Sequence, residues 1–291
     1  MAVDVVVVSY NSREHLRGCV APLAHAEGVR VVVVDNASAD GSLDSIADLP
    51  VERVRLAENV GFASACNAGS NRGSAPAVLF LNPDARIDPS SLGRLVEVLD
   101  GSDAVGAVAP KIVDAEGHIE PSQRRFPGLR SIFARALFLH RLLPSLDELV
   151  HEPAAYEQPA SPDWVSGACV LVRRSALEAV NGFDEGFFLY GEDIDLARRL
   201  RNAGYDIRFE PQASAMHAGG GSAPRPQLTP QLAVSRLRYL RKHHGRLAAA
   251  IGRVGVGLNA CTHMLVSRGG MAQRVGHARA LRVAATDGNR L

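Results

Sequence analysis

Three carboxylates follow an aromatic, apolar segment in the sequence FFLYGEDIDLARRL, residues 187–200: Glu192, Asp193 and Asp195. Carboxylates can accept protons or bind cations, so the cluster is a candidate for chemistry. A simpler explanation is a charged surface helix, because acids in its first turn and bases in its last turn complement the helix dipole. Asp195 and Arg199 would also form an i,i+4 pair. The stretch taken alone favours this simpler explanation.

Four short polar clusters each follow a run of β-branched, apolar residues in the first hundred residues. The runs lie at 3–10, 29–36, 51–57 and 77–84, and they end in Ser9-Tyr10-Asn11, Asp35-Asn36, Glu58-Asn59 and Asn82-Pro83-Asp84. We expect buried parallel strands there, with helices between them to about Ala26, from about Asp40, from Gly61 and over 89–101. This βαβαβαβ order predicts an α/β fold with helices on both faces of a parallel sheet. Ligands of such sheets bind at the carboxyl ends of the strands, so the clusters predict a ligand site.

The second half of the chain has a less regular pattern. We expect strands at 105–114 and 164–174, a helix over 129–143, and two short extended pieces within 205–217. A Gly/Pro-rich loop at 217–228 and a shift in charge place a boundary near residue 225, and a helical tail follows. The expected domains are 1–224, with halves of about 1–104 and 105–224, and a C-terminal extension over 225–291.

Charge is unevenly distributed along the 291 residues. The net charge is +1, but residues 225–291 contain twelve Lys and Arg against one acid, Asp287, so this segment carries +11 and the rest of the chain −10. The asymmetry predicts a basic tail that meets an anionic partner. The N-terminus is expected to form a strand rather than a signal peptide, and no apolar run is long enough to predict a spanning helix. The widely spaced cysteines favour reduced thiols in the cytoplasm over disulfides or a zinc site: Cys19, Cys66, Cys169 and Cys261.

Seven motifs occur in an order that resembles the inverting family-2 glycosyltransferases of the GT-A fold. They span roughly residues 3–222 and are VSYNS, VVDNASADGS, NVGFASACN, LNPDA, WVSGACVLVRR, FLYGEDIDLARRL and HAGGGS. The resemblance implies a mixed, mostly parallel sheet flanked by helices, and transfer of a sugar from a nucleotide-sugar to a hydroxyl group. The motifs are most similar to those of bacterial dTDP-rhamnose-dependent rhamnosyltransferases of cell-wall linker and polysaccharide synthesis. Members with this motif set often use polyprenyl-diphosphate-linked acceptors.

The resemblance implies that Asp35, at the end of the second strand, accepts a hydrogen bond from the pyrimidine base of the donor. A carboxylate is a suitable partner for an imide N–H. The alternative role for Asp35 is an Asx turn with Asn36 and Ser38. The other donor-binding residues that the resemblance implies are Ser9, Asn11, Asn36, Asn59, Gly61, Asn67, Asn82 and Ser222.

The sequence LNPDA occupies the place of the DxD motif of the family, which implies a divalent cation, Mn²⁺ or Mg²⁺, at the donor diphosphate. Hard cations prefer oxygen ligands, and the first Asp of the motif is replaced here by Asn82. Asp84 is then the charged ligand, and the resemblance implies His217 as a further one. The alternative for His217 is a structural histidine at the end of a strand. The glycines and Ser222 that follow it could wrap a diphosphate.

The resemblance gives Asp193 the role of the catalytic base, and Glu192 the role of orienting the acceptor or Asp193. The base would deprotonate the acceptor hydroxyl as its oxygen attacks the anomeric carbon from the face opposite the nucleotide.

Four further residues are expected near the acceptor. Arg124 and Arg125 of the turn SQRRFP would hold a diphosphate of the donor or acceptor, although a solvated Arg pair is the alternative. Trp164 and Gly167 would form a wall of the acceptor site, although Trp164 could instead be a buried core residue.

The basic tail has an apolar stripe with steps of three and four residues: Leu237, Leu240, His244, Leu247, Ile251, Val254 and Leu258. Six bases lie off the stripe: Arg236, Arg238, Arg241, Lys242, Arg246 and Arg253. Such a helix could lie on an anionic membrane through residues 232–291, on the cytoplasmic face. The glycines predict a break near 252–257. Docking on its own domain and pairing in a homodimer are the alternatives.

Other functions are less well supported by the sequence. A family-2 transferase could use another donor, such as a UDP-hexose. A nucleotidyltransferase usually has a Gly-rich basic loop after the first strand, and VSYNSREHL has none. A nucleic-acid-binding tail would need stacking side chains, and Tyr239 is its one aromatic residue, so no nucleic-acid partner is expected. A catalytically inactive sugar-binding relative would fit Asn82, but Asp193 argues against it.

Overall fold

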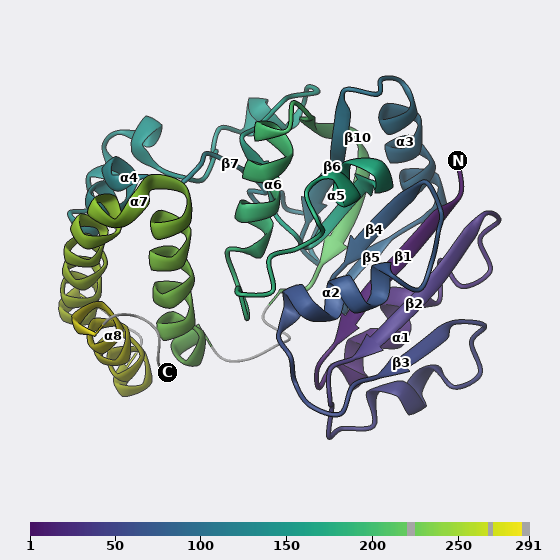
Figure 1. Ribbon diagram of the computed structural model, residues 1–291, viewed down its shortest axis with the longest axis horizontal. Helices are drawn as coiled ribbons and strands as arrows, with labels where there is room; N and C mark the ends of the chain where they lie inside the picture. The colour runs from purple at the N-terminus through teal and green to yellow at the C-terminus, as the bar shows by residue number, and fades with distance from the viewer. Residues whose placement is uncertain (220–224, 267–269, 287–291) are drawn as a thin grey trace. The chain divides into compact units, whose positions relative to one another are not determined.

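The computed structural model describes residues 1–219, 225–266 and 270–286 (Figure 1). The chain divides into two compact units. The first unit, termed here the sheet unit, comprises Met1–Arg124, His151–Phe188 and Glu192–Ser222. The second, termed the helical unit, comprises Arg125–Val150, Leu189–Gly191 and Ala223–Leu291.

The sheet unit is built on one eight-stranded sheet in the order β3-β2-β1-β4-β9-β6-β10-β5. These strands are β1 (Val3–Ser9), β2 (Val29–Asp35), β3 (Glu52–Arg55), β4 (Ala77–Leu81), β5 (Ala85–Ile87), β6 (Val105–Val113), β9 (Cys169–Arg173) and β10 (Asp206–His217). Strands β3, β2, β1 and β4 are parallel neighbours, and so are β6 and β10. Strand β9 is antiparallel to β4 and β6, and strand β5 is antiparallel to β10. The strands β7 (Gln123–Arg124) and β8 (Trp164–Val165) form a separate antiparallel pair. The expected α/β fold, with a mixed and mostly parallel sheet, is confirmed.

Helices cover both faces of this sheet, and its central strands are therefore buried on both sides. One face packs with α1 (Arg13–Val20), the 3₁₀ helix η1 (Ser42–Ile46) and α3 (Pro89–Asp100), through alternate residues such as Val5 and Val7. The other face packs with α2 (Phe62–Ser70), where a Cβ at Gly69 would lie 2.4 Å from Val6. The same face carries α6 (Glu192–Asn202) (Figure 1). A short helix, α5 (Arg174–Ala179), follows β9.

Several elements differ from the expected pattern. The helix expected from about Asp40 is only the short η1. The segment 164–174 splits into β8 and β9, which belong to different sheets. The two extended pieces expected within 205–217 are one strand, β10, with an irregularity between Glu210 and Ser214.

The helical unit contains α4 (Leu129–Ala136), α7 (Arg225–Val266) and α8 (Gly270–Ala285), with the 3₁₀ turns η2 (Leu139–Arg141) and η3 (Pro144–Leu146) after α4. The helix expected over 129–143 therefore ends early. A further 3₁₀ turn, η4 (Pro153–Tyr156), belongs to the sheet unit. The core of the helical unit brings α4, both ends of α7 and α8 together through Ile132, Ala233, Leu237, Leu240, Val256, Ala260, Ala280, Val283 and Ala284.

The break expected near 252–257 in the tail is wrong. Helix α7 is interrupted at Gly245, whose φ of 85° and ψ of 177° are not helical. Gly252 and Gly255 lie instead inside the helix, where a Cβ would be 2.2 Å from Leu240 and 2.7 Å from Ile132. These glycines allow close helix packing, which outweighs their weak helix propensity.

The predicted stripe of the tail is also divided by this interruption. Leu237 and Leu240 are buried in the core of the helical unit, whereas Leu247, Ile251 and Val254 are exposed. Among the predicted surface bases, Arg236 binds the buried Glu148, and Arg253 donates to carbonyl groups at the end of α8. Among the described residues, no helix is both long and apolar enough to cross a lipid bilayer.

Candidate active site

The parallel strands bring the predicted donor residues to the carboxyl edge of the sheet. Asp35 is 1% exposed, and its Oδ1 accepts a hydrogen bond from the backbone N–H of Ser38 at 3.2 Å. Its Oδ2 lies 3.4 Å from Nε of Arg55, which comes from β3. Asp35 therefore forms the Asx turn through Oδ1, while its Oδ2 lies beside the guanidinium of Arg55. Ser9 Oγ is fully buried and has no hydrogen-bond partner among the described residues.

Three asparagines at this edge tie the strand-end loops together. Asn36 Nδ2 donates to Asn59 Oδ1 at 2.9 Å, and Asn36 Oδ1 accepts from the N–H of Val60. Asn59 Oδ1 also accepts from the N–H of Gly61. Asn11 Oδ1 accepts from the N–H of Ala39. The side-chain amides therefore hold the shape of the loops that carry the site.

Gly61 and Asn67 connect α2 to the segment before the acid cluster. Gly61 has a φ of 87°, which disfavours residues with a side chain. A Cβ there would also lie 2.6 Å from the carbonyl oxygen of Phe188, which is too close. The amide of Asn67 makes hydrogen bonds to both backbone groups of Phe183 and to Glu185 Oε1. Both residues thereby position the loop 183–188, a contact that the sequence did not predict.

His217, at the end of β10, lies between two carboxylates. Its Nε2 is 3.4 Å from Asp84 Oδ1, and its Nδ1 is 3.0 Å from Glu120 Oε2. Burial lowers the pKa of His217, but the hydrogen bonds to Asp84 and Glu120 outweigh burial and raise the pKa to about 9. Asp84 and His217 thus come together as predicted, and a carboxylate and an imidazole within 3.4 Å are a donor set that Mn²⁺ or Mg²⁺ can use. Asn82 is held nearby through its backbone, which bonds to Ala168 and Ala85.

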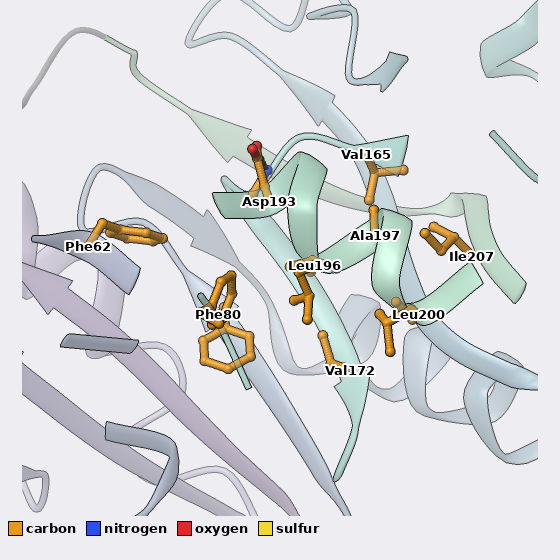
Figure 2. A pocket seen from close by; sticks show the side chains of 13 residues that line it. Phe62, Phe80, Val165, Val172, Asp193, Leu196, Ala197, Leu200 and Ile207 are labelled. Carbon is orange, nitrogen blue, oxygen red and sulfur yellow. Dashed lines mark hydrogen bonds between the residues drawn. The ribbon is translucent and has the colours of Figure 1, made fainter. Parts of the chain in front are cut away.

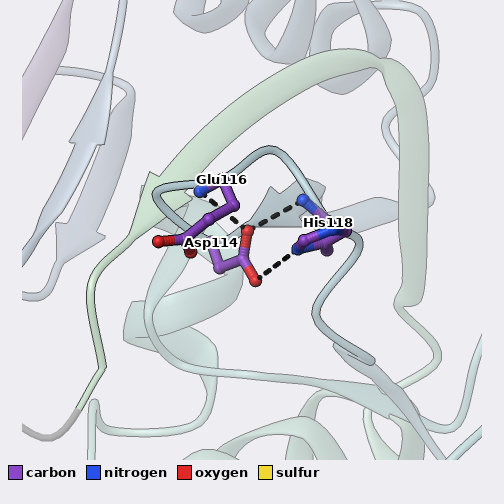
Figure 3. A group of neighbouring side chains, drawn as sticks. All are labelled: Asp114, Glu116 and His118. Carbon is purple, nitrogen blue, oxygen red and sulfur yellow. Dashed lines mark hydrogen bonds and ion pairs between the residues drawn. The ribbon is translucent and has the colours of Figure 1, made fainter.

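A second group of potential cation ligands lies on the surface turn after β6 and comprises Asp114, Glu116 and His118 (Figure 3). Asp114 Oδ1 accepts from the N–H groups of Glu116 and His118, and Asp114 Oδ2 bonds to the His118 ring. These hydrogen bonds account for the cluster as an Asx turn that reverses the chain.

Asp193 lies in the first turn of α6, where the helix N-terminus favours negative charge. Its Oδ1 accepts from its neighbour Ile194 N–H at 2.8 Å, and its Oδ2 accepts from Gly167 N–H at 3.3 Å. Burial raises the pKa of Asp193, while the Ile194 N–H, the charge of Arg124 and the Gly167 N–H oppose that rise. Hydrogen bonds that favour the carboxylate, combined with burial that makes it easier to protonate, suit a general base.

Glu192, the neighbour of Asp193, is buried, and its Oε2 has no hydrogen-bond partner within the described chain. Burial and the adjacent charge of Asp193 raise the pKa of Glu192 well above its usual value. The third acid, Asp195, is fully buried and pairs with Arg199 at 2.7 Å, as its i,i+4 spacing predicted. The three acids therefore occupy different environments: Asp195 is held in an ion pair, Glu192 Oε2 has no partner in the described chain, and Asp193 accepts from two backbone N–H groups.

An apolar pocket lies between α6 and the sheet, and Asp193 is on its rim (Figure 2). Leu196 and Leu200 of α6 face Phe80 and Val172 of the sheet across it. Burial of Asp193 raises its pKa, because burial disfavours the charged carboxylate.

The two arginines of SQRRFP have different partners in the structure. Arg124 belongs to the sheet unit, and its guanidinium lies 5.1 Å from the ring of the buried Trp164 in a cation–π contact. Arg125 belongs to the helical unit, and its guanidinium donates to the carbonyl groups of Asp147 and Leu149. Arg125 thus has backbone partners in the structure, and a joint grip of the two arginines on a diphosphate stays a prediction. Ser222 lies outside the described residues.

Glu192→Gln is expected to stabilise the protein increasingly as the pH rises. The folded-state pKa of Glu192 is raised, so this group favours folding at low pH, and its contribution is lost as the pH rises through that pKa. Gln has the shape of the protonated acid but does not titrate. Urea unfolding at about pH 5 and about pH 8 measures the difference in free energy of unfolding between variant and wild type. An equal difference at both pH values would show that Glu192 is not the titrating group.

The sheet, its polar edge and the carboxylate at the start of α6 together define the GT-A architecture of nucleotide-sugar-dependent transferases. Residues 4–180 match the profile of the family described as Glycosyl transferase family 2, and residues 153–218 match that of the N-terminal domain of galactosyltransferase. The chain belongs to glycosyl transferase family 2.

Individual relatives agree with this assignment. The chain is 33% identical over 251 residues to N-acetylglucosaminyl-diphospho-decaprenol L-rhamnosyltransferase of Mycobacterium tuberculosis, over 76% of this chain and 77% of the relative. It is 30% identical over 141 residues to rhamnosyltransferase WbbL of Escherichia coli, over 48% and 51% of the two chains. Among solved structures, the mannosyltransferase PcManGT from Pyrobaculum calidifontis, in complex with GDP-Man and Mn²⁺, has a TM-score of 0.60 at 17% identity, over 98% of this chain and 87% of that chain. The chain is therefore a glycosyltransferase of the GT-A fold.

Proposed function

We propose that this glycosyltransferase moves L-rhamnose from dTDP-rhamnose to a hydroxyl group of a polyprenyl-diphosphate-linked sugar, with inversion at the anomeric carbon. The observation that carries the proposal is the 33% identity to the mycobacterial rhamnosyltransferase over three quarters of both chains. The name of that relative specifies a decaprenyl-diphosphate acceptor with N-acetylglucosamine. The second bacterial relative is also named a rhamnosyltransferase.

Asp193 is the catalytic base in this proposal. It accepts the proton of the acceptor hydroxyl while that oxygen forms a bond to the anomeric carbon, and the bond from that carbon to the nucleotide diphosphate breaks on the opposite face. The N–H groups of Ile194 and Gly167 hold the carboxylate in place. Burial and the adjacent Asp193 raise the pKa of Glu192 well above its usual value, which favours the neutral form of Glu192 beside the Asp193 carboxylate.

The donor occupies the carboxyl edge of the sheet in this proposal. Asp35 accepts from the imide N–H of thymine, and the buried Ser9 hydroxyl gains a partner in the nucleoside. The loops that Asn11, Asn36 and Asn59 hold together shape this pocket. The ribose and diphosphate of the donor lie beside Gly61, Asn67 and Asn82. These residues contribute by positioning the backbone around the donor.

Asp84 and His217 would hold the divalent cation, with the carbonyl of Asn82 nearby. The ion would neutralise the charge that develops on the leaving diphosphate. Ser222 and the glycines before it remain candidates for wrapping that group. On the acceptor side, Gly167 contacts Asp193, and Arg124 is stacked on Trp164, which places a cation near the base.

A panel of donors tests this specificity. The full-length protein, with Mn²⁺ or Mg²⁺ and a polyprenyl-diphosphate-linked N-acetylglucosamine, is incubated with dTDP-rhamnose, UDP-GlcNAc, UDP-galactose or GDP-mannose. Nucleotide release that depends on the acceptor is expected with dTDP-rhamnose. Acceptor-dependent release with a UDP-hexose alone would replace rhamnose by that hexose and leave the glycosyltransferase assignment intact.

The helical unit is proposed to bind an anionic membrane surface, where a lipid-linked acceptor has its diphosphate. Most of the large apolar side chains that are exposed in the described residues belong to this unit, including Leu142, Leu247, Val254 and Leu265. Exposed bases accompany them: Arg130, Arg141, Arg238, Arg241, Lys242, Arg246, Arg274 and Arg279. Each base near such a surface contributes about 1 kcal/mol, so the unit could be held there without a spanning helix.

The double variant Leu247→Gln, Val254→Gln is expected to weaken binding to vesicles that contain phosphatidylglycerol by about tenfold or more, because it removes two exposed apolar side chains. Ile119→Gln, an exposed apolar residue of the sheet unit, is the matched control and should bind as the wild type does. Vesicle sedimentation at rising salt measures the effect, since screening should release the protein.

Point variants are preferable to truncation here. Removal of residues after Gln231 would delete Arg236, which pairs with the buried Glu148, and Ser235, which donates to the Leu189 carbonyl. If the wild type ignores these vesicles and the double variant instead loses a dimer in sedimentation equilibrium, the exposed face is a contact between subunits.

A further inference from the structure

Glu120 reaches His217 because of a tight reversal of the chain after β6. Asp114 N–H donates to His118 O at 2.9 Å, and the Asp114 carboxylate caps the N–H groups of Glu116 and His118 (Figure 3). The returning chain then pairs with β6 again, since Glu120 N–H donates to Ile112 O at 2.9 Å. Strand β10 is the neighbour of β6, so this turn delivers the Glu120 side chain to the end of β10.

The contact that results fixes one nitrogen of His217 and leaves the other for Asp84. The Glu120 carboxylate can only accept, so the Nδ1–H of His217 donates to its Oε2 at 3.0 Å. Nε2 is then directed to Asp84 Oδ1 at 3.4 Å. His217 and Asp84 are 14% and 8% exposed in their side chains, whereas Glu120 is 44% exposed. The more exposed acid, Glu120, therefore contacts Nδ1 of the histidine, and the buried acid, Asp84, faces Nε2 on the other side of the ring.

We propose that Glu120 is a positioning residue for the cation site: it holds His217 so that Nε2, and not Nδ1, is the nitrogen presented beside Asp84. This inference rests on the proposed use of Asp84 and His217 as cation ligands. A carboxylate on the far nitrogen of a ligating histidine fixes its tautomer and ring orientation and makes the near nitrogen more basic.

Glu120 also compensates in charge for Asn82. With Asn82 in the place of an acid, Asp84 is the single carboxylate of the predicted ligand set. Glu120 adds a second negative charge one residue further out, connected through the imidazole ring. The alternative explanation for Glu120 is an ion pair that only stabilises the turn, and it predicts a change in unfolding with no change in cation coordination.

Mn²⁺ binding in the presence of dTDP distinguishes these explanations. Free Mn²⁺ is measured by electron paramagnetic resonance, and electron spin echo modulation reports ¹⁴N nuclei bound to the ion. Glu120→Ala is expected to weaken Mn²⁺ binding by about 10- to 100-fold, a typical effect of removing such an outer partner, and to alter the ¹⁴N modulation. Glu120→Gln should lose less, because its amide oxygen still accepts from Nδ1–H. Glu116→Ala, on the same turn, is the matched control and should match the wild type.

Two results with the variants would overturn the inference. One is Mn²⁺ affinity in Glu120→Ala equal to that in Glu116→Ala. The other is an unchanged ¹⁴N modulation in Glu120→Ala with a lowered unfolding midpoint, which would make the contact structural. A wild type that binds no Mn²⁺ with dTDP also overturns it, whereas sugar transfer in EDTA would then show that the proposed function survives. If the wild type binds Mn²⁺ normally but transfers no sugar, the proposed function is wrong and the inference about Glu120 stands.

Discussion

Asp193→Asn is expected to lower kcat for sugar transfer by ~10²–10⁴ while donor affinity stays within a few fold. The Asn side chain keeps the shape of the acid and one oxygen that can accept from Ile194 or Gly167 N–H, but it cannot accept the proton of the acceptor. The comparison variant is Glu192→Gln, which keeps the size of the neighbouring acid and should lower kcat less than Asp193→Asn does. Steady-state transfer and calorimetric donor binding measure the two quantities on each variant.

The pH dependence should report the same group. Because burial raises the pKa of Asp193, the loss of activity on the acid side should begin at a higher pH than an ordinary aspartate would give. If Asp193→Asn keeps more than about a tenth of the wild-type kcat, the assignment of the base is wrong, and Glu192 becomes the next candidate.

The second large effect concerns the cation. Asp84→Ala is expected to weaken nucleotide-sugar binding only when a divalent cation is present, and His217→Ala should do so in part, because both side chains lie at the same edge within 3.4 Å. Calorimetry of donor binding in EDTA and in Mn²⁺ measures this for the wild type and both variants. Equal donor affinity of the wild type in both conditions would contradict cation-assisted binding.

A pH dependence of cation binding should accompany this result. The pKa of His217 without a cation is about 9, so its ring is protonated at neutral pH, and a bound cation has to displace that proton. Mn²⁺ affinity should therefore rise as the pH increases towards 9. The linked stability has the opposite trend, since the raised pKa favours folding fully below about pH 6.5 and that contribution is lost as the pH rises through 9.

The sequence predicted the nucleotide half of the fold well because its physics is local. Apolar runs that lead up to Ser9, Asp35 and Asn82 predict buried parallel strands, and the parallel arrangement then places their ends together. Asp84 and His217 are 133 residues apart in the chain, and the family resemblance, not spacing, linked them before the structure placed them side by side.

Other parts of the site could not be found in this way. Glu120 follows an ordinary Asx turn and carries no local pattern that would connect it to His217; only the pairing of β10 with β6 makes that contact. Arg124 and Arg125 are adjacent in sequence, yet tertiary packing assigns them to different compact units. Adjacent positions in the sequence do not show which partners each guanidinium binds: Arg124 lies over Trp164, and Arg125 donates to backbone carbonyl groups.

The tail shows a different limit. An apolar stripe on a helix predicts that something covers it, but not what. The first part of the stripe, with Leu237 and Leu240, is covered by the helical unit itself, whereas Leu247 and Val254 beyond Gly245 are exposed. Glycines that suggest a break by propensity can instead mark close helix contacts, as Gly252 and Gly255 do.

The anomeric configuration of the product is the most direct test of the central proposal, inverting transfer of rhamnose to a lipid-linked sugar with Asp193 as the base. Wild-type protein is incubated with dTDP-rhamnose and polyprenyl-diphosphate-linked N-acetylglucosamine, and the one-bond carbon–proton coupling of the new anomeric centre is measured by NMR. We expect one rhamnose on the acceptor, in the configuration opposite to that of the donor, and no product with Asp193→Asn. A product that retains the configuration of the donor, or an Asp193→Asn variant that makes the product at the wild-type rate, would contradict the account.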